Sequence, residues 1–114
     1  MPRSEARVVT DRAARYAKQL SAHLGRKITA NWSEETGRGE LTFSAGTATL
    51  VAEPQVLLLT VEGAADSLPQ LEDVVGRHLV RFGSRDELVV EWRRDNGEPG
   101  LVHRIEEPMA DAEG

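Results

Sequence analysis

Polar side chains that could bind or transform a ligand recur at helical spacing in two stretches of the sequence. The first row repeats at intervals of four, three and four residues, which places its members on one flank of a helix: Arg12, Tyr16, Gln19 and His23. In the second stretch, His78 lies seven residues after Leu71 and four before Phe82, at the margin of an apolar stripe, and Arg81 lies beyond it. If both helices cover one face of a sheet, His23 and His78 point into the groove between them.

Anionic oxygens are the ligand atoms that suit such a groove. Arginine and histidine side chains form charge-assisted hydrogen bonds with carboxylate or catecholate oxygens, and these are among the stronger hydrogen bonds in proteins. The same spacing also fits two histidines at the edge of the core, satisfied by the backbone or by neighbouring acids. Both the ligand-binding and the structural interpretation stay open at this point.

Metal binding or general-base catalysis by the histidines is a third interpretation. A zinc or non-haem iron site normally has three protein ligands. At 100° per residue, Glu72 and Asp73 lie about 120° and about 140° around the helix from His78, so neither completes such a site. No serine, threonine or carboxylate is placed by spacing to partner a histidine as base. We therefore assign no catalytic residue, no metal ligand and no cofactor.

Several classes of function are excluded by what the sequence lacks. It contains no cysteine, and no G-x-S-x-G, G-x-x-x-x-G-K-[ST], H-E-x-x-H or G-x-G-x-x-G motif. The first residues lack the apolar run of a signal peptide, and no stretch approaches the roughly 18 apolar residues of a membrane span. We expect a cytoplasmic protein that does not insert into membranes.

Two helices must position the polar rows. A helix over 11–24 is predicted by the N-cap residue Thr10 and the closing Gly25. A second helix over 67–82 ends at Gly83, and its apolar residues repeat at three, four, four and three: Leu68, Leu71, Val75, Leu79 and Phe82. Both helices are amphipathic, which predicts that each packs one face on a sheet.

The strands of that sheet are indicated by alternating polar and apolar residues. We predict strands over 6–9, 27–33, 40–44, 47–52, 56–61 and 86–94. The 56–61 strand is almost continuously apolar, which suggests a central position covered on both sides, or a dimer interface. The order β-α-β-β-β-β-α-β is typical of an α+β fold, a two-layer structure in which an antiparallel sheet carries both helices on one face.

The end of the chain differs in composition from the rest. Six of the 19 acidic residues but only one of the 14 basic residues follow Arg94, so the whole net charge of −5 belongs to this segment. We expect a single α+β domain over 6–94 and an acidic, largely flexible tail over 95–114, in which 101–105 is an alternative edge strand. A neutral body with an acidic tail argues against nucleic acid as a partner, because phosphate neutralisation supplies most of such binding.

Two blocks of sequence resemble a known bacterial family. They are Thr10–His23 (TDRAARYAKQLSAH) and Leu71–Phe82 (LEDVVGRHLVRF), the latter followed by Arg85–Leu88 (RDEL) and Trp92. Over residues 6–94 the chain resembles DUF2218, a family named only as a domain of unknown function. The resemblance implies a small soluble bacterial domain, sometimes encoded beside or fused to siderophore-interacting flavoproteins. It transfers no catalytic residues, and this chain carries no flavin-binding motif.

These observations lead to three hypotheses of function. The first is a non-enzymatic small-ligand-binding or accessory module for a small anionic ligand such as a ferric chelate, with a siderophore-interacting flavoprotein as partner. Its site would comprise Arg12, Tyr16, Gln19, His23, His78 and Arg81. The second is a structural or protein-interaction domain, and the third is a small histidine-dependent enzyme.

Overall fold

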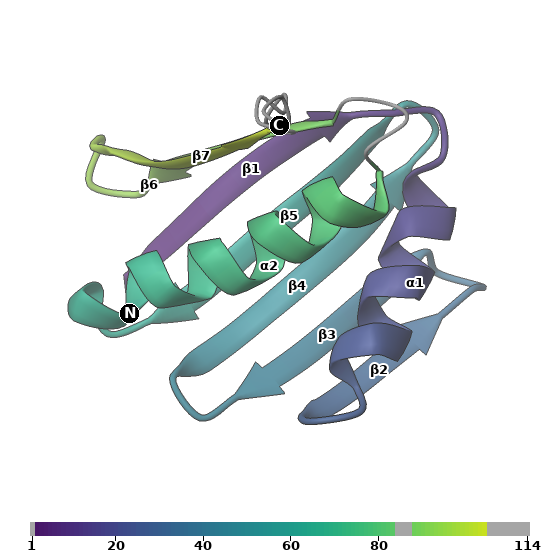
Figure 1. Cartoon of the computed structure of the whole chain (residues 1–114), viewed down its shortest axis with the longest axis horizontal. Coiled ribbons are helices and arrows are strands. Elements are labelled where there is room, and N and C mark those ends of the chain that lie inside the picture. The colour runs from purple at the N-terminus through teal and green to yellow at the C-terminus, as the bar shows by residue number, and fades with distance from the viewer. Residues whose placement is uncertain (1, 84–87, 105–114) are drawn as a thin grey trace, which may run out of the picture.

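Seven antiparallel strands and two helices make up the part of the chain that the structure describes. A computed structural model describes residues 2–83 and 88–104 (Figure 1). A single 3₁₀ turn over Ala65–Ser67 precedes the second helix. The elements are β1 (Arg3–Val9), α1 (Ala13–Leu24), β2 (Thr29–Ser33), β3 (Arg38–Phe43), β4 (Gly46–Glu53), β5 (Val56–Gly63), α2 (Leu68–Phe82), β6 (Val89–Arg94) and β7 (Pro99–Arg104).

The strand order β2-β3-β4-β5-β1-β6-β7 places the first strand near the middle of the sheet. Strands β2 to β5 form a meander, and β1 then pairs with β5 along its whole length, from Val9 opposite Val56 to Arg3 opposite Glu62. Both helices lie on the same face of this sheet (Figure 1). The α+β fold predicted from the sequence is confirmed.

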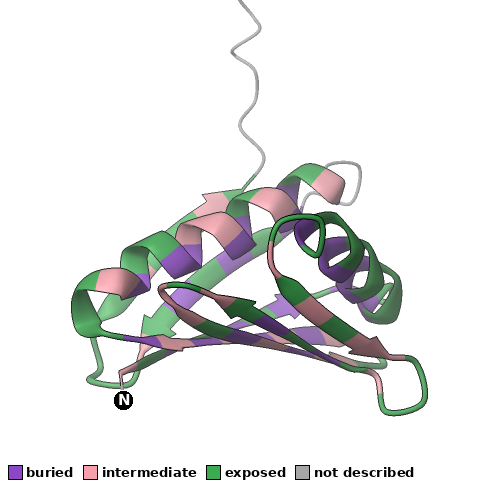
Figure 2. Cartoon of the chain, turned by 90° about the horizontal axis from the view of Figure 1, so that it is seen from below, coloured by how far each residue is buried: buried purple, intermediate pink, exposed green. Residues whose placement is uncertain are grey.

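The core lies between the sheet and the two helices. Figure 2 shows the buried residues where the helices face the sheet and exposed residues on their outer sides. Along β1 the side chains alternate strictly, so that Ser4, Ala6 and Val8 are buried while their neighbours face the other side. In β5 the buried positions alternate with half-buried ones, including Leu58 on the face that no helix covers. The central position predicted for this strand is therefore confirmed, although only one of its faces is fully buried.

The boundary of the domain lies further along the chain than the sequence predicts. We expected a flexible tail from residue 95, but β7 pairs antiparallel with β6, with Val90 opposite His103 and Glu91 opposite Val102. Arg94 and Glu98 close the connecting turn through a 2.9 Å backbone hydrogen bond. The expected tail is thus wrong for 99–104, which form the edge strand given as the alternative. Residues 105–114 lie outside the described part.

Three smaller differences concern the ends of elements. Strand β1 starts at Arg3 rather than at residue 6, because pairing with β5 extends to Glu62. Helix α1 starts at Ala13, and the hydroxyl of Thr10 accepts a 3.1 Å hydrogen bond from the Arg12 N–H just before it. The predicted start of the 86–94 strand lies outside the described residues.

Among the helices of residues 2–83 and 88–104, none has the length and apolarity that a membrane crossing requires.

Candidate functional site

His23 of α1 and His78 of α2 meet where the two helices approach each other. Their ring centroids lie 5.1 Å apart with the planes tilted by 43°, and the Phe82 ring stands edge-on to His23 at 5.3 Å. His23 is exposed and His78 is half-buried. The packing of the helices thus brings together the two histidines that the sequence places at the margins of their apolar stripes.

The hydrogen bond of His78 fixes which of its nitrogens can meet a ligand. Nδ1 lies 2.7 Å from the carbonyl oxygen of Val74, one turn earlier in α2. A carbonyl oxygen only accepts hydrogen bonds, so Nδ1 carries the proton and donates it. In the neutral ring the lone pair is then on Nε2, and this atom has no hydrogen-bond partner among the described residues. His78 is therefore held in one orientation with one nitrogen free.

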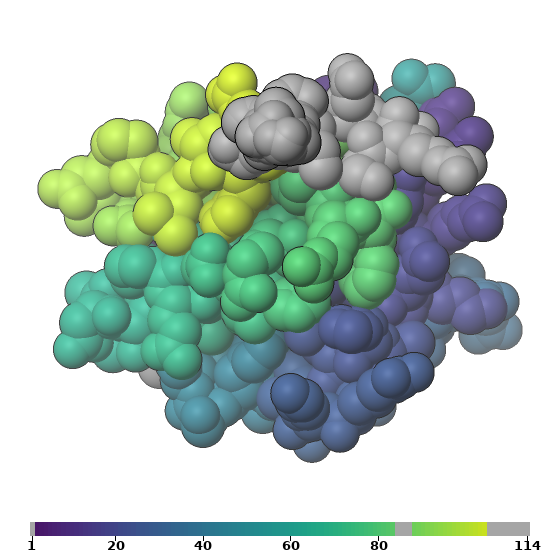
Figure 3. Space-filling view, in the orientation of Figure 1, coloured from purple at the N-terminus to yellow at the C-terminus, as the bar shows by residue number. Residues whose placement is uncertain are grey.

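Helix packing explains why the histidines reach this position. The apolar stripes of both helices face the sheet and are buried, including Ala17 and Leu20 in α1 and Val75 and Leu79 in α2. His23 directly precedes the buried Leu24, and His78 directly precedes Leu79, so each ring lies at the border between the stripe and solvent. Figure 3 shows atoms of the two helices in contact across this face of the molecule.

The other predicted site residues do not gather at the histidine pair. Arg12, Gln19 and Arg81 are exposed, and no contact within the described residues joins them to His23 or His78. Tyr16 is only 6% exposed and belongs to the core, below the end of α2. A methyl group on Gly83 would lie 3.4 Å from the ring carbon Cζ of Tyr16. Tyr16 therefore supports the contact between the helices from inside.

A second polar cluster lies where α2 meets the ends of β6 and β7, and it was not predicted. The carboxylate of Glu72 is fully buried and accepts two hydrogen bonds from the Arg94 guanidinium, at 3.1 and 3.0 Å. The backbone N–H of Leu101 in β7 donates a third, at 3.1 Å. Burial alone would raise the pKa of Glu72, but the hydrogen bonds from Arg94 and Leu101 and the Arg94 charge outweigh it and lower that pKa below its ordinary value.

The sequence does contain a signal for this cluster. Glu72 lies four residues after Leu68 and seven before Leu79, so it falls on the apolar stripe of α2 instead of beside it. A carboxylate on a buried stripe requires a cationic partner, because an unpaired buried charge is very costly. Arg94 is that partner, with 20% of its side chain exposed.

His103 of β7 packs beside this cluster. Its Nε2 lies 3.3 Å from an Asp73 carboxylate oxygen, and Asp73 also accepts a 3.3 Å hydrogen bond from Arg77. The His103 ring lies so close to Gly76 that any side chain at that position would collide with it. These contacts, with those of Glu72, attach β7 to α2. They hold the two elements together and leave no open face on His103, whose side chain is only 11% exposed.

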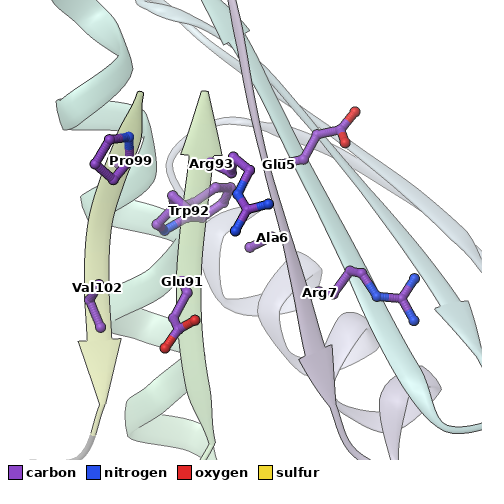
Figure 4. Close-up of a pocket in the computed structure, with 9 residues that line it drawn as sticks. Glu5, Ala6, Arg7, Glu91, Trp92, Arg93, Pro99 and Val102 are labelled. Atoms are coloured by element: carbon purple, nitrogen blue, oxygen red, sulfur yellow. The ribbon is translucent and has the colours of Figure 1, made fainter. Parts of the chain in front are cut away.

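Two further observations limit the chemistry that the site can perform. No group of three histidine, aspartate or glutamate side chains able to hold a metal ion occurs within residues 2–83 and 88–104. A cavity of about 480 Å³ is present, but it lies on the face of the sheet away from the helices, between β1 and β6 (Figure 4). This cavity does not include the histidine pair, of which His23 is exposed and His78 half-buried.

Comparison with known proteins finds a matching family and similar solved structures. A family model described as "Uncharacterized protein conserved in bacteria (DUF2218)" matches residues 5–93. The NMR structure of PA4090 from Pseudomonas aeruginosa is similar, with a TM-score of 0.68 and 32% sequence identity, covering 82% of this chain and 96% of that chain. A search among curated proteins finds no match.

Proposed function

Because the chain belongs to the DUF2218 family of uncharacterised bacterial proteins, whose name assigns no activity, we propose a function from the histidine pair: non-enzymatic binding of a small anionic ligand. The observation that carries the proposal is the approach of His23 and His78 from two helices, with ring centroids 5.1 Å apart and the Nε2 atom of His78 without a partner among the described residues. Two imidazoles at this separation can bind two oxygens of one carboxylate-bearing or catechol-bearing molecule. Because Nδ1 of His78 donates to Val74, Nε2 accepts from a catechol hydroxyl when the ring is neutral and donates to an anionic oxygen only as an imidazolium.

In this proposal the other predicted residues assist ligand binding at the histidine pair. Gln19 precedes His23 by one turn of α1, and Arg81 follows His78 by almost one turn of α2, so both can reach a ligand larger than the ring pair. Arg12 adds a positive charge at the start of α1. Tyr16 keeps the helices at their separation from within the core.

The chemical class of the ligand rests on the resemblance to a family that accompanies siderophore-interacting flavoproteins. A ferric chelate presents several carboxylate or catecholate oxygens and carries negative charge, which suits histidine and arginine side chains. Binding is favoured over catalysis because neither His23 nor His78 has a hydrogen bond or ion pair to a Ser, Thr, Asp or Glu side chain in the described residues. The protein would then hold or deliver a chelate that another protein reduces.

Calorimetric titration with ferric citrate tests this proposal. The double variant His23→Gln/His78→Gln keeps some hydrogen-bonding capacity but removes both imidazoles. We expect the wild-type protein to bind and the double variant to bind at least tenfold more weakly. Arg15→Gln is the matched control, because Arg15 is an exposed residue of the same helix without a described contact, and it should bind as the wild type does.

The structural interpretation of the histidines makes the opposite prediction. It expects no ferric citrate binding by either protein and a loss of about 1–3 kcal/mol in the urea unfolding free energy of the double variant, through broken hydrogen bonds. That pair of results would contradict ligand binding at this site.

Docking to a partner protein is a second candidate function, favoured by the face of the sheet that no helix covers. Apolar side chains are exposed there, including Val9, which is 79% exposed, and Val89 in β6, which is 40% exposed. The partner that the family resemblance implies is a siderophore-interacting flavoprotein. Hydrogen exchange with and without such a protein would show protection of β1 and β6 if this face docks, and unchanged exchange would count against it.

A further inference from the structure

The sheet has an opening between β1 and β6 on the face away from the helices. A cavity of about 480 Å³ lies there, within the range of small-molecule sites, and Glu5 and Arg7 of β1 and Glu91 and Arg93 of β6 line it (Figure 4). Trp92 and Ala6 contribute to its floor. None of these residues belongs to the histidine pair, so this inference is independent of the proposed function.

The opening exists because the pairing between β1 and β6 stops early. Only Ser4 and Glu5 pair with β6, opposite Arg94 and Arg93. On the far side of β6, the pairing with β7 shifts register between Glu91 and Arg93. The ladder between β1 and β6 therefore ends after these two residue pairs, and beyond Glu5 no further described residues of the two strands pair.

Four charges of alternating sign surround this opening. Glu5 lies opposite Arg93, and the same antiparallel register places Arg7 opposite Glu91. Opposite charges at facing positions normally attract one another across a sheet. Here, within the described residues, no ion pair crosses the opening, and Glu5 approaches Arg3 of its own strand instead, at 3.8 Å.

The four charged side chains lie differently around the opening. In Figure 4 the guanidinium of Arg93 reaches from β6 toward β1 beside Ala6, while Glu5 and Arg7 project from β1 on the side away from β6. Among the described residues, Arg7, Glu91 and Arg93 have no ion pair. Arg7, Glu91 and Arg93 are thus available to a ligand without breaking an ion pair, and Glu5 would give up only its exposed 3.8 Å contact with Arg3.

We propose that this opening is a second binding site and that it accepts a zwitterionic ligand of the short-peptide class. A carboxylate would be met by Arg7 or Arg93, and an ammonium group by Glu5 or Glu91. Residues two apart in a strand are separated by about 6.6 Å, and an extended dipeptide or tripeptide spans about 7–10 Å. A purely anionic or purely cationic molecule would be attracted by two of these four side chains and repelled by the other two.

Triglycine and its two capped forms provide the test. Triglycine has both charges, N-acetyl-triglycine lacks the ammonium group and triglycinamide lacks the carboxylate. In calorimetric titrations of the full chain, we expect triglycine to bind at least tenfold more tightly than either capped peptide. Arg7→Gln/Arg93→Gln should remove the preference for the free carboxylate, and Glu5→Gln/Glu91→Gln the preference for the free ammonium group.

The control variants separate this site from the rest of the protein. Arg38→Gln/Glu40→Gln changes two exposed residues of β3 away from the opening and should bind triglycine as the wild type does. His23→Gln/His78→Gln should also bind triglycine normally, whatever its effect on ferric citrate. The urea midpoints of the Arg7 and Glu5 double variants should match that of the wild type. Equal binding of the three peptides, or no binding of any, would overturn the proposal.

Discussion

The carboxylate of Glu72 joins helix α2 to two other parts of the molecule, through two hydrogen bonds from Arg94 at the end of β6 and one from Leu101 in the edge strand β7. Because it is fully buried, its charge depends on the Arg94 guanidinium and the Leu101 amide for stabilisation that solvent would otherwise provide. This one residue explains why 99–104 are part of the fold.

Replacing Glu72 by glutamine should destabilise the protein substantially. The change leaves Arg94 without its counter-charge, and we expect a loss of about 3 kcal/mol in the free energy of unfolding, the lower end of the range for a broken buried pair because Arg94 is partly exposed. Urea unfolding at neutral pH measures it. Glu34→Gln, which removes an exposed pair with Lys18, is the control and should cost less than about 1 kcal/mol. If both variants lost the same unfolding free energy, the buried pair of Glu72 and Arg94 would contribute no more than an exposed ion pair, which would contradict this prediction.

The pH dependence of stability should also depend on Glu72. Its pKa is lower in the folded protein than the ordinary value of about 4.3 expected after unfolding. The stability that this shift contributes is complete above the ordinary pKa and is lost as the pH falls through the lower, folded pKa. Urea unfolding from about pH 6 down to about pH 3 should therefore show the wild-type advantage over Glu72→Gln shrinking. A difference that stays constant over this range would show that the Glu72 charge is not its source.

At the scale of residues, the sequence predicted the histidine pair but not the Glu72 cluster. Helical spacing alone places His23 and His78 at the margins of two apolar stripes, and packing on one sheet face brings them together. The prediction that Glu72 does not join His78 agrees with its contacts, which are to Arg94 and Leu101, whereas His78 lies beside His23. The partners of Glu72 could not be predicted, because Arg94 and Leu101 lie 22 and 29 residues away and reach it only through the sheet topology.

At the scale of elements, the strand β7 carries the clearest prediction. A variant that ends at Arg94 loses the pairing with β6, the Leu101 hydrogen bond to Glu72 and the contact of His103 with Asp73. Because 1 kcal/mol corresponds to roughly 4–8 °C in a domain of this size, we expect Tm to fall by more than about 10 °C. A variant that ends at Arg104 keeps all these contacts and is the control, with Tm within a few degrees of the full chain. Similar Tm values for both truncations would mean that β7 adds no stability.

Most elements could be predicted from the local sequence pattern, but β7 could not. Both helices have a clear apolar stripe and closing glycines, and β1 to β6 alternate between the two faces of the sheet. Strand β7 is short, contains Pro99 and Gly100, and leaves Leu101 and Val102 partly exposed, so its composition is that of a loop. Gly100 is required there, because a side chain would collide with the Glu72 carboxylate. This segment is a strand because it pairs with β6 and is held by its contacts with α2.

At the scale of the whole molecule, charge predicts which partners are disfavoured. The chain has a net charge of −5, and exposed ion pairs such as Arg3 with Glu62 and Arg38 with Glu40 mix both signs on the strands. Without a continuous basic surface, the protein releases few counterions from DNA. We expect no mobility shift of duplex DNA at sub-micromolar protein and physiological salt, about 150 mM. A shift under these conditions would require a cationic surface that the described residues lack.

The central claim is that the approach of the two helices creates an anion-binding site at His23 and His78. The most direct measurement is a two-dimensional ¹H–¹⁵N NMR titration with gallium citrate, a diamagnetic substitute for ferric citrate. Ligand binding at the histidines predicts saturable shifts centred on the end of α1 and the second half of α2, and their loss in His23→Gln/His78→Gln. Shifts confined to the opening between β1 and β6, or spectra that do not change, would contradict the claim.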